Sequence, residues 1–194
     1  MASILKVDTI QDQSGNNIIN ESADTITIGA SGDTITIPTG ATLTVPSGGL
    51  SGQNYPAFEA TRTSNQNLTN DAWVKVTFNS ETYDTDDAFT SDTFTVPSGQ
   101  AGKYYIYGSL RINSSLSSDI ADAYLGLYKN GALFRYSQFS TFPAFDIHAA
   151  QPAYATVVDA EVGDYYEIYG LVDTSGGTPR AASHSNFGAY RIGD

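Results

Sequence analysis

The segment Asp84-Thr-Asp-Asp87 holds the side chains of this sequence that are best suited to binding a metal ion. Carboxylate oxygens are the ligands that calcium prefers, and Asp84, Asp86 and Asp87 could supply them. Their spacing does not match an EF-hand loop, and an acidic loop exposed to water accounts for the same residues more simply. We therefore expect no cofactor, with calcium as the one candidate that the sequence raises.

The residue types needed for common catalytic sites are scarce. His148 and His184 are the 2 histidines and there is no cysteine, whereas zinc sites need several such ligands close together. The sequence contains neither a Gly-x-Ser-x-Gly motif nor the glycine patterns that bind nucleotide phosphates. The 21 Asp and Glu residues permit many carboxylate pairs, so acid–base catalysis stays open. We expect a binding protein and not an enzyme.

Aromatic side chains gather around one proline in a segment suited to contact with a receptor. They are Phe139, Phe142 and Phe145, and His148 follows them. Such rings could face a sugar or a protein, but packing in a subunit seam explains Phe142 and Phe145 better. Phe139 and His148 are therefore the candidates for receptor contact in this segment.

A second candidate for receptor contact is the segment 174–184. Its Gly, Ser, Thr and Pro residues predict an exposed loop, and loops often carry recognition residues. Arg180 is its one cation and His184 ends it, so both are candidates for receptor contact.

The charge of the chain excludes one class of partner. Its 194 residues carry a formal charge of −12, and the 9 Lys and Arg residues are scattered, so nucleic-acid binding is not expected. No apolar stretch approaches the roughly 20 residues that cross a bilayer. Residues 1–8 lack the pattern of a signal peptide. We expect a soluble protein that is made in the cytoplasm.

One five-residue pattern occurs three times near the N-terminus. Its copies occupy residues 24–28, 33–37 and 41–45, and each alternates polar and apolar residues as a strand with one apolar face does. The apolar positions are Ile26, Ile28, Ile35, Ile37, Leu43 and Val45. Strands this short cannot form a stable isolated sheet with one apolar face in water. We therefore expect residues 23–52 to form a stalk, in which copies of the chain pack these side chains around a shared axis.

Residues 1–22 precede the stalk as a separate segment. Its apolar residues are Ile4, Leu5, Val7 and Ile10. The turn sequence Ser14-Gly-Asn16 follows them and predicts a hairpin, or an arm that docks on another protein. Residues 46–52 are rich in Gly and Ser and predict a flexible joint before residues 53–194. The expected parts are thus an attachment arm, a stalk and a C-terminal head.

The C-terminal part predicts only strands. Strand-length segments recur about every ten residues with Gly, Pro, Asn and Asp between them, which is typical of a sandwich or jelly roll. They are 58–62, 73–78, 89–96, 103–113, 124–129, 133–139, 154–158, 164–171 and 185–192. Gly102 would permit a tight turn into a strand, and Asn130-Gly131 a two-residue hairpin. The side chains for a sandwich core or a subunit seam are Tyr104, Ile106, Tyr124, Tyr166 and Ile168.

Five motifs occur in the order known from the C1q-like globular domain. They are the spacing of Phe78, Asp84 and Phe89, and the segments 94–106, 127–131, 162–169 and 187–192. Phe94 lies closer to Phe89 than in that family, and Ile106 and Gly108 replace aromatic residues, which indicates changed loops or a related trimeric jelly roll. Residues 53–194 thus resemble a C1q-like head. The resemblance implies an all-β, ten-stranded jelly-roll sandwich that forms homotrimers, some of which bind calcium.

The N-terminal segment resembles another group of proteins. Residues 3–10 and the following Ser-Gly-Asn turn are similar to the openings of virion proteins of marine bacteriophages, in which short β repeats and a small head often follow. With the stalk and the head, this resemblance implies a virion structural protein, a tail or head fibre or spike. Its partners would be its own copies, another virion protein bound through the arm, and a glycan or protein of the host surface.

Three other functions fit parts of this pattern. A capsid decoration or vertex protein that stabilises the particle would use the same architecture. A bacterial soluble C1q-like binding protein would need no virion, but the missing signal-peptide pattern counts against it. A polysaccharide depolymerase would need catalytic residues that no motif in the sequence identifies.

Overall fold

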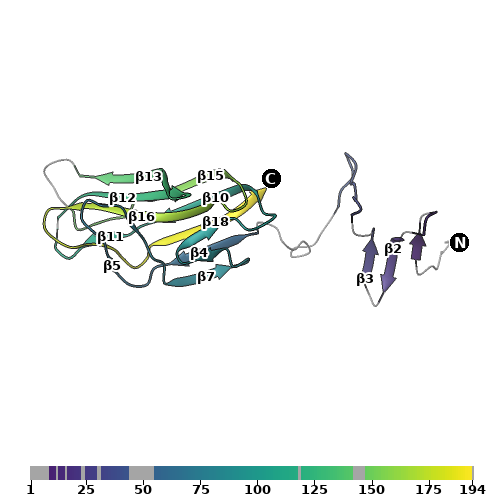
Figure 1. Cartoon of the computed structure of the whole chain (residues 1–194), viewed down its shortest axis with the longest axis horizontal. Helices are drawn as coiled ribbons and strands as arrows, with labels where there is room; N and C mark the ends of the chain where they lie inside the picture. The colour runs from purple at the N-terminus through teal and green to yellow at the C-terminus, as the bar shows by residue number, and fades with distance from the viewer. Residues whose placement is uncertain are drawn as a thin grey trace. The chain divides into compact units, whose positions relative to one another are not determined.

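The computed structural model describes residues 9–11, 13–15, 17–22, 25–29, 32–43, 55–117, 119–141 and 147–193. They belong to two compact units, Met1–Ser51 and Gly52–Asp194 (Figure 1). Every regular element in these residues is a β-strand. Among them there is accordingly no helix that could span a membrane. The all-β prediction is confirmed.

The N-terminal unit contains a three-stranded antiparallel sheet. β1 (Thr9–Gln11) pairs with β2 (Asn17–Ser22), and β2 pairs with β3 (Thr25–Ile28). In the turn between β1 and β2, Gly15 has a φ of 85°, which glycine adopts without strain. The hairpin predicted at this turn is therefore confirmed.

Only the first copy of the repeat forms a strand within one chain. Residues 25–28 are β3, whereas residues 33–37 and 41–43 belong to no strand of a single chain, so strands there stay a prediction for the stalk, in which other copies would supply the partners. The physical reason is that β2 supplies a neighbouring strand for β3, while residues 33–37 and 41–43 pair with no strand among the described residues. The predicted apolar residues Ile4, Leu5, Val7 and Val45 lie outside the described residues.

The C-terminal unit, here called the head, is a sandwich of two antiparallel sheets. The first sheet has the strand order β15-β10-β18-β4-β7. Its strands are β4 (Ala57–Thr61), β7 (Ser80–Asp84), β10 (Gly102–Ser109), β15 (Ala153–Ala160) and β18 (Asn186–Gly193). The second sheet has the order β13-β12-β16-β9-β8, and β6 also pairs with β16. Its strands are β6 (Val74–Lys75), β8 (Phe89–Thr90), β9 (Thr93–Thr95), β12 (Ile120–Lys129), β13 (Ala132–Ser140) and β16 (Tyr165–Thr174).

A smaller sheet lies at the end of the sandwich that faces away from the C-terminus (Figure 1). Its strands are β14 (Ala149–Ala150), β11 (Ile112–Ser114), β17 (Pro179–Ala181) and β5 (Gln66–Asn67), in this order. The chain enters the head at the opposite end, because Ala57 at the start of β4 pairs with Tyr190 near the end of β18. The small sheet and its loops are therefore the end of the head that lies farthest from where the chain enters it.

Aromatic rings fill the space between the two large sheets. The ring of Phe58 stacks 4.5 Å from that of Phe89 and 5.0 Å from that of Phe94, and meets Phe187 edge-on at 4.9 Å. Such contacts join β4 and β18 of the first sheet to β8 and β9 of the second. The core thus links strands that are distant in the sequence.

The side chains that were predicted for the core divide into two groups. Tyr104, Ile106, Tyr166 and Ile168 are buried in it, as predicted. Tyr124 is not part of the sandwich core. The buried residues around it in β12 are Ala123 and Leu125, and side chains alternate along a strand, so Tyr124 lies on the outward face.

Asn130 and Gly131 form the predicted two-residue turn between β12 and β13. Their φ angles are 53° and 79°, and the flanking residues Lys129 and Ala132 pair. The Asn130 amide donates to Asp164 Oδ1 (2.7 Å) and its oxygen accepts from the Tyr165 N–H (2.9 Å). The turn is therefore fixed to the start of β16.

Replacing Asp164 with asparagine is expected to lower the free energy of unfolding by about 1–2 kcal/mol at neutral pH. Burial raises the pKa of this carboxyl, but hydrogen bonds from Lys129, Asn130 and the Glu161 N–H outweigh burial and bring the pKa below its usual value. A carboxyl with a lowered pKa stabilises the folded state above its unfolded-state pKa, and this stability is lost as the pH falls through the folded-state value. Urea denaturation between neutral pH and about pH 2 measures the difference, which should shrink below about pH 4. A difference that stays constant to the lowest pH contradicts this role.

Candidate functional site

The structure does not gather the predicted calcium ligands around one point. The Asp84 carboxylate accepts hydrogen bonds from the N–H groups of Ala88 (3.0 Å) and Phe89 (2.7 Å), so it caps the loop that follows β7. Asp86 and Asp87 are exposed to solvent. In the described residues, no group of three or more His, Cys, Asp or Glu side chains is arranged to hold a metal ion. Calcium binding therefore stays a prediction, and the described residues of one chain do not supply a set of ligands for it.

The predicted receptor contacts lie on different sheets. Phe139, near the end of β13 in the second sheet, is 40% exposed. His148 precedes β14, and its Nδ1 lies 3.2 Å from the Leu116 carbonyl oxygen. Arg180 lies in β17, and His184 follows that strand with a φ of 72°. Because β14 and β17 both pair with β11, Arg180 lies in the small end sheet and His148 directly precedes one of its strands, apart from the sheet of Phe139.

The outward face of the first sheet is rich in tyrosine. We call it the tyrosine face, and it comprises Tyr83, Tyr105, Tyr107, Val157 and Tyr190. The ring of Tyr105 lies 5.9 Å from that of Tyr107 and 5.4 Å from that of Tyr190. Val157 pairs with Tyr105 and is 53% exposed. A continuous, partly exposed surface of this kind is suited to packing against a partner.

Tyr107 is held firmly in this face. Its hydroxyl donates to Glu59 Oε2 at 2.8 Å. Burial, and then the bond to Glu59, raise the pKa of Tyr107 well above its usual value, so the hydroxyl remains a donor. The ring lies across Gly188, where a Cβ atom would collide with it. The orientation of Tyr107 therefore depends on glycine at position 188.

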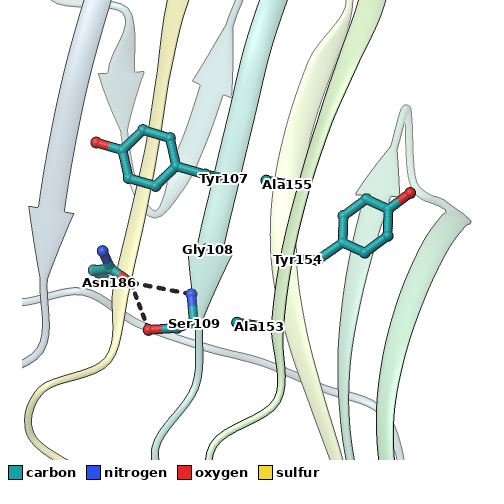
Figure 2. Close-up of a pocket in the computed structure, with 7 residues that line it drawn as sticks. All are labelled: Tyr107, Gly108, Ser109, Ala153, Tyr154, Ala155 and Asn186. Carbon is teal, nitrogen blue, oxygen red and sulfur yellow. Dashed lines mark hydrogen bonds between the residues drawn. The ribbon is translucent and has the colours of Figure 1, made fainter.

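A shallow pocket opens beside Tyr107 (Figure 2). It is lined by Tyr107, Gly108, Ser109, Ala153, Tyr154, Ala155 and Asn186. The Asn186 side-chain oxygen accepts hydrogen bonds from the N–H (3.0 Å) and the hydroxyl (2.7 Å) of Ser109, which joins β18 to β10. The small lining residues leave room for a side chain of a partner. The pocket is therefore suited to packing more than to catalysis.

The tyrosine face is absent from the sites predicted by sequence, although one signal for it exists. In Tyr104-Tyr-Ile-Tyr107, every residue has a large side chain, so large side chains lie on both faces of the strand. Tyr104 and Ile106 fill the core, so Tyr105 and Tyr107 must face outward. Large side chains on both faces of a strand are typical of a sheet that is covered on both sides.

No protein-family model and no curated protein sequence matches the chain. Among solved structures, the globular domain of zebrafish complement 1qA protein is similar, with a TM-score of 0.51 and 18% identity over 71% of this chain and 97% of that one. The head therefore has a jelly-roll fold similar to that of this C1q domain. A TNF protein, Eiger from S. frugiperda, is similar with a TM-score of 0.47 and 14% identity over 71% of this chain and 92% of that one. The predicted all-β jelly-roll sandwich is confirmed and the homotrimer stays a prediction, because the likeness to the zebrafish domain concerns the fold alone.

Proposed function

We propose that this chain is a structural protein of a bacteriophage particle, in which three copies form a fibre or spike. Residues 1–22 attach it to another virion protein, and residues 23–52 form a threefold stalk. Residues 53–194 form a head that binds the host surface without enzymatic activity. Three heads on one stalk would hold a repetitive surface better than one, because linked sites raise the overall affinity.

The exposed apolar side chains of the stalk carry this proposal. The exposed fractions are 67% for Ile26, 55% for Ile28, 60% for Ile35, 46% for Ile37 and 64% for Leu43. Burying one such side chain stabilises a structure by roughly 1.5–3 kcal/mol. When copies of the chain bury all of these side chains together, the free energy gained offsets the entropy lost on association. Chains that share a stalk in this way form an elongated projection, as a fibre requires.

The tyrosine face supports the same assembly in the head. If this face of one copy packs against a different surface of the next copy, the contact is head-to-tail, and such contacts can close into a ring. The pocket beside Tyr107 would then receive an apolar side chain from the neighbouring head. The exposed Phe139, on the edge strand β13, is suited to that role.

Antibodies against the purified protein test its place on a virus. In electron micrographs of phage particles whose genome encodes this chain, the antibodies are expected to label a fibre or spike. Purified protein that is first incubated with host cells should reduce adsorption of these particles. Labelling of the capsid with unchanged adsorption would assign the chain to particle stabilisation instead. Absence of the protein from purified particles contradicts the proposal.

A further inference from the structure

A second aromatic surface lies on the outward face of the second sheet, on the opposite side of the sandwich from the tyrosine face. We call it the aromatic platform, and it comprises Trp73, Tyr124, Tyr128, Tyr136 and Tyr169. The Trp73 ring lies 6.0 Å from Tyr124 and 5.9 Å from Tyr128. Tyr128 stacks on Tyr169 at 4.0 Å, and Tyr136 lies 6.1 Å from Tyr124. The five rings therefore form one connected surface.

A glycine at the centre of the platform brings these rings together. Gly126 pairs with Tyr136 of β13 on one side and with Tyr169 of β16 on the other. Trp73 covers it, and a Cβ at position 126 would lie 2.7 Å from Trp73 Cζ3. Glycine thus leaves the space that the indole occupies between the neighbouring tyrosines.

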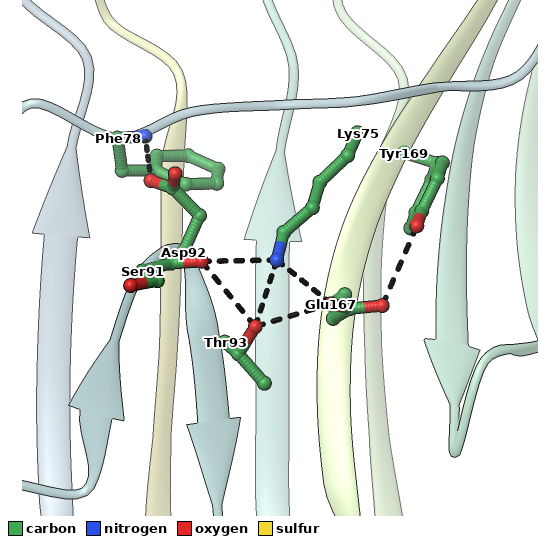
Figure 3. Close-up of polar contacts among 7 residues, drawn as sticks. All are labelled: Lys75, Phe78, Ser91, Asp92, Thr93, Glu167 and Tyr169. Atoms are coloured by element: carbon green, nitrogen blue, oxygen red, sulfur yellow. Dashed lines mark hydrogen bonds and ion pairs between the residues drawn. The ribbon is translucent and has the colours of Figure 1, made fainter.

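Hydrogen bonds hold the platform in place before any ligand binds. The Tyr124 hydroxyl accepts from Gln138 Nε2 at 2.7 Å. The Tyr169 hydroxyl donates to Glu167 at 3.5 Å, and Glu167 is bound in turn by Lys75 at 2.7 Å (Figure 3). Rings that are already ordered lose little conformational entropy when a ligand covers them.

The edge of the platform is acidic and rich in hydrogen-bonding groups. Asp122 and Asp173 pair across β12 and β16, and the Gln138 amide donates to Asp122 at 3.3 Å. Burial raises the pKa of Tyr124, and the charges of Asp122 and Asp173 raise it further. An anionic ligand would be repelled here, and an apolar protein surface would cover these carboxylates without offering them donors. A fitting ligand has C–H faces for the rings, hydroxyl donors for the carboxylates, and no negative charge.

We propose that the aromatic platform binds the chain of a neutral polysaccharide. Sugar rings would lie against the aromatic rings, and their hydroxyls would donate to the carboxylates of Asp122 and Asp173. This inference rests on the proposed function and names the class of host molecule that the head would contact. The platform and the tyrosine face lie on opposite sheets, so burying the tyrosine face of a copy does not in itself cover the platform of that copy.

The fluorescence of Trp73 tests this directly, because Trp73 is the 1 tryptophan of the chain. The full-length protein is titrated with cellohexaose, maltohexaose, N-acetylchitohexaose and, as the anionic comparison, hexagalacturonate. At least one neutral hexasaccharide is expected to shift the emission of Trp73 to saturation, and hexagalacturonate is not. Calorimetry with the same sugar then gives the Kd of two variants. Tyr136→Ala is expected to weaken binding about tenfold or more, which corresponds to the loss of one stacked ring.

Tyr55→Ala is the matched control, because Tyr55 is 45% and Tyr136 54% exposed, and Tyr55 precedes β4 and belongs to neither the tyrosine face nor the platform. It should bind the sugar as the unmodified protein does. The proposal is overturned if no neutral hexasaccharide binds at about 10 mM, if only hexagalacturonate binds, or if both variants lose binding equally. The first result would direct the search to a protein receptor, the second to an anionic glycan, and the third to a sugar site elsewhere on the protein. The titration requires no virus, so its failure leaves the antibody labelling and the proposed virion role standing.

Discussion

The protein is expected to have a mass in solution of three times the 20.7 kDa of one chain. Two sets of substitutions, combined in one variant, should lower this mass to that of a single chain. The stalk set replaces Ile26, Ile28 and Ile35 with serine, which removes apolar surface that copies of the chain would bury. The face set replaces Tyr105 and Tyr190 with glutamate. Burying each new carboxylate at a subunit contact would cost several kcal/mol. Either set alone should leave trimers that dissociate on dilution.

Light scattering coupled to gel filtration, at one protein concentration, measures these masses. Tyr136→Glu is the control for an added charge, since Tyr136 lies on the second sheet and should not affect assembly. A single-chain mass for the unmodified protein would disprove the threefold stalk. A combined variant that remains trimeric would show that other surfaces hold the copies together.

Replacing Lys75 with methionine is expected to lower the free energy of unfolding by about 3 kcal/mol. Lys75 Nζ donates to Glu167 Oε1 (2.7 Å), Thr93 Oγ1 (2.7 Å) and the Ser91 carbonyl oxygen (2.9 Å) (Figure 3). The Glu167 side chain is only 11% exposed, so methionine would leave an almost buried carboxylate without its cation. For a chain of this size, the loss corresponds to a decrease in Tm of roughly 6–12 °C.

Thermal unfolding at equal protein concentration measures this loss. Lys103→Met is the matched control, because Lys103 Nζ lies 3.8 Å from Asp159 Oδ1 and the two side chains are 50% and 85% exposed. Its effect should stay below about 0.5 kcal/mol. Adding Glu167→Leu to Lys75→Met should recover part of the stability, because it removes the unpaired carboxylate. Equal losses for the two lysines would refute the buried role of Lys75.

One predicted strand, 89–96, is two strands joined by a tight turn. Ser91 and Asp92 have φ angles of 52° and 60°, which non-glycine residues seldom adopt. Lys75 binds the Ser91 carbonyl oxygen, and the Asp92 carboxylate accepts from the Phe78 N–H at 2.6 Å (Figure 3). The groups that stabilise this turn lie at least 14 residues away in sequence, so local residue preferences could not reveal it.

The predicted strand 103–113 is divided for a similar reason. β10 belongs to the first sheet and β11 to the small end sheet. Between them, the Leu110 N–H bonds to the Pro152 carbonyl oxygen (3.0 Å) and the Arg111 N–H to Ser185 Oγ (2.9 Å). Leu110 and Arg111, where the strand divides, are neither Gly nor Pro, and it is partners from distant segments that redirect the chain there.

Features that depend on neighbouring residues could be predicted from the amino-acid sequence. The alternation in β10 and β16 placed Tyr104, Ile106, Tyr166 and Ile168 in the core, and the Asn130-Gly131 turn fixed the β12–β13 hairpin, because side-chain period and turn preference are local properties. Which strands lie side by side became visible only in the folded structure. It joined Lys75 to Glu167, 92 residues apart, and it brought Trp73 over Gly126 to complete the aromatic platform. Strand order depends on how two sheets share one core, and alternation within a strand carries no information about its neighbours.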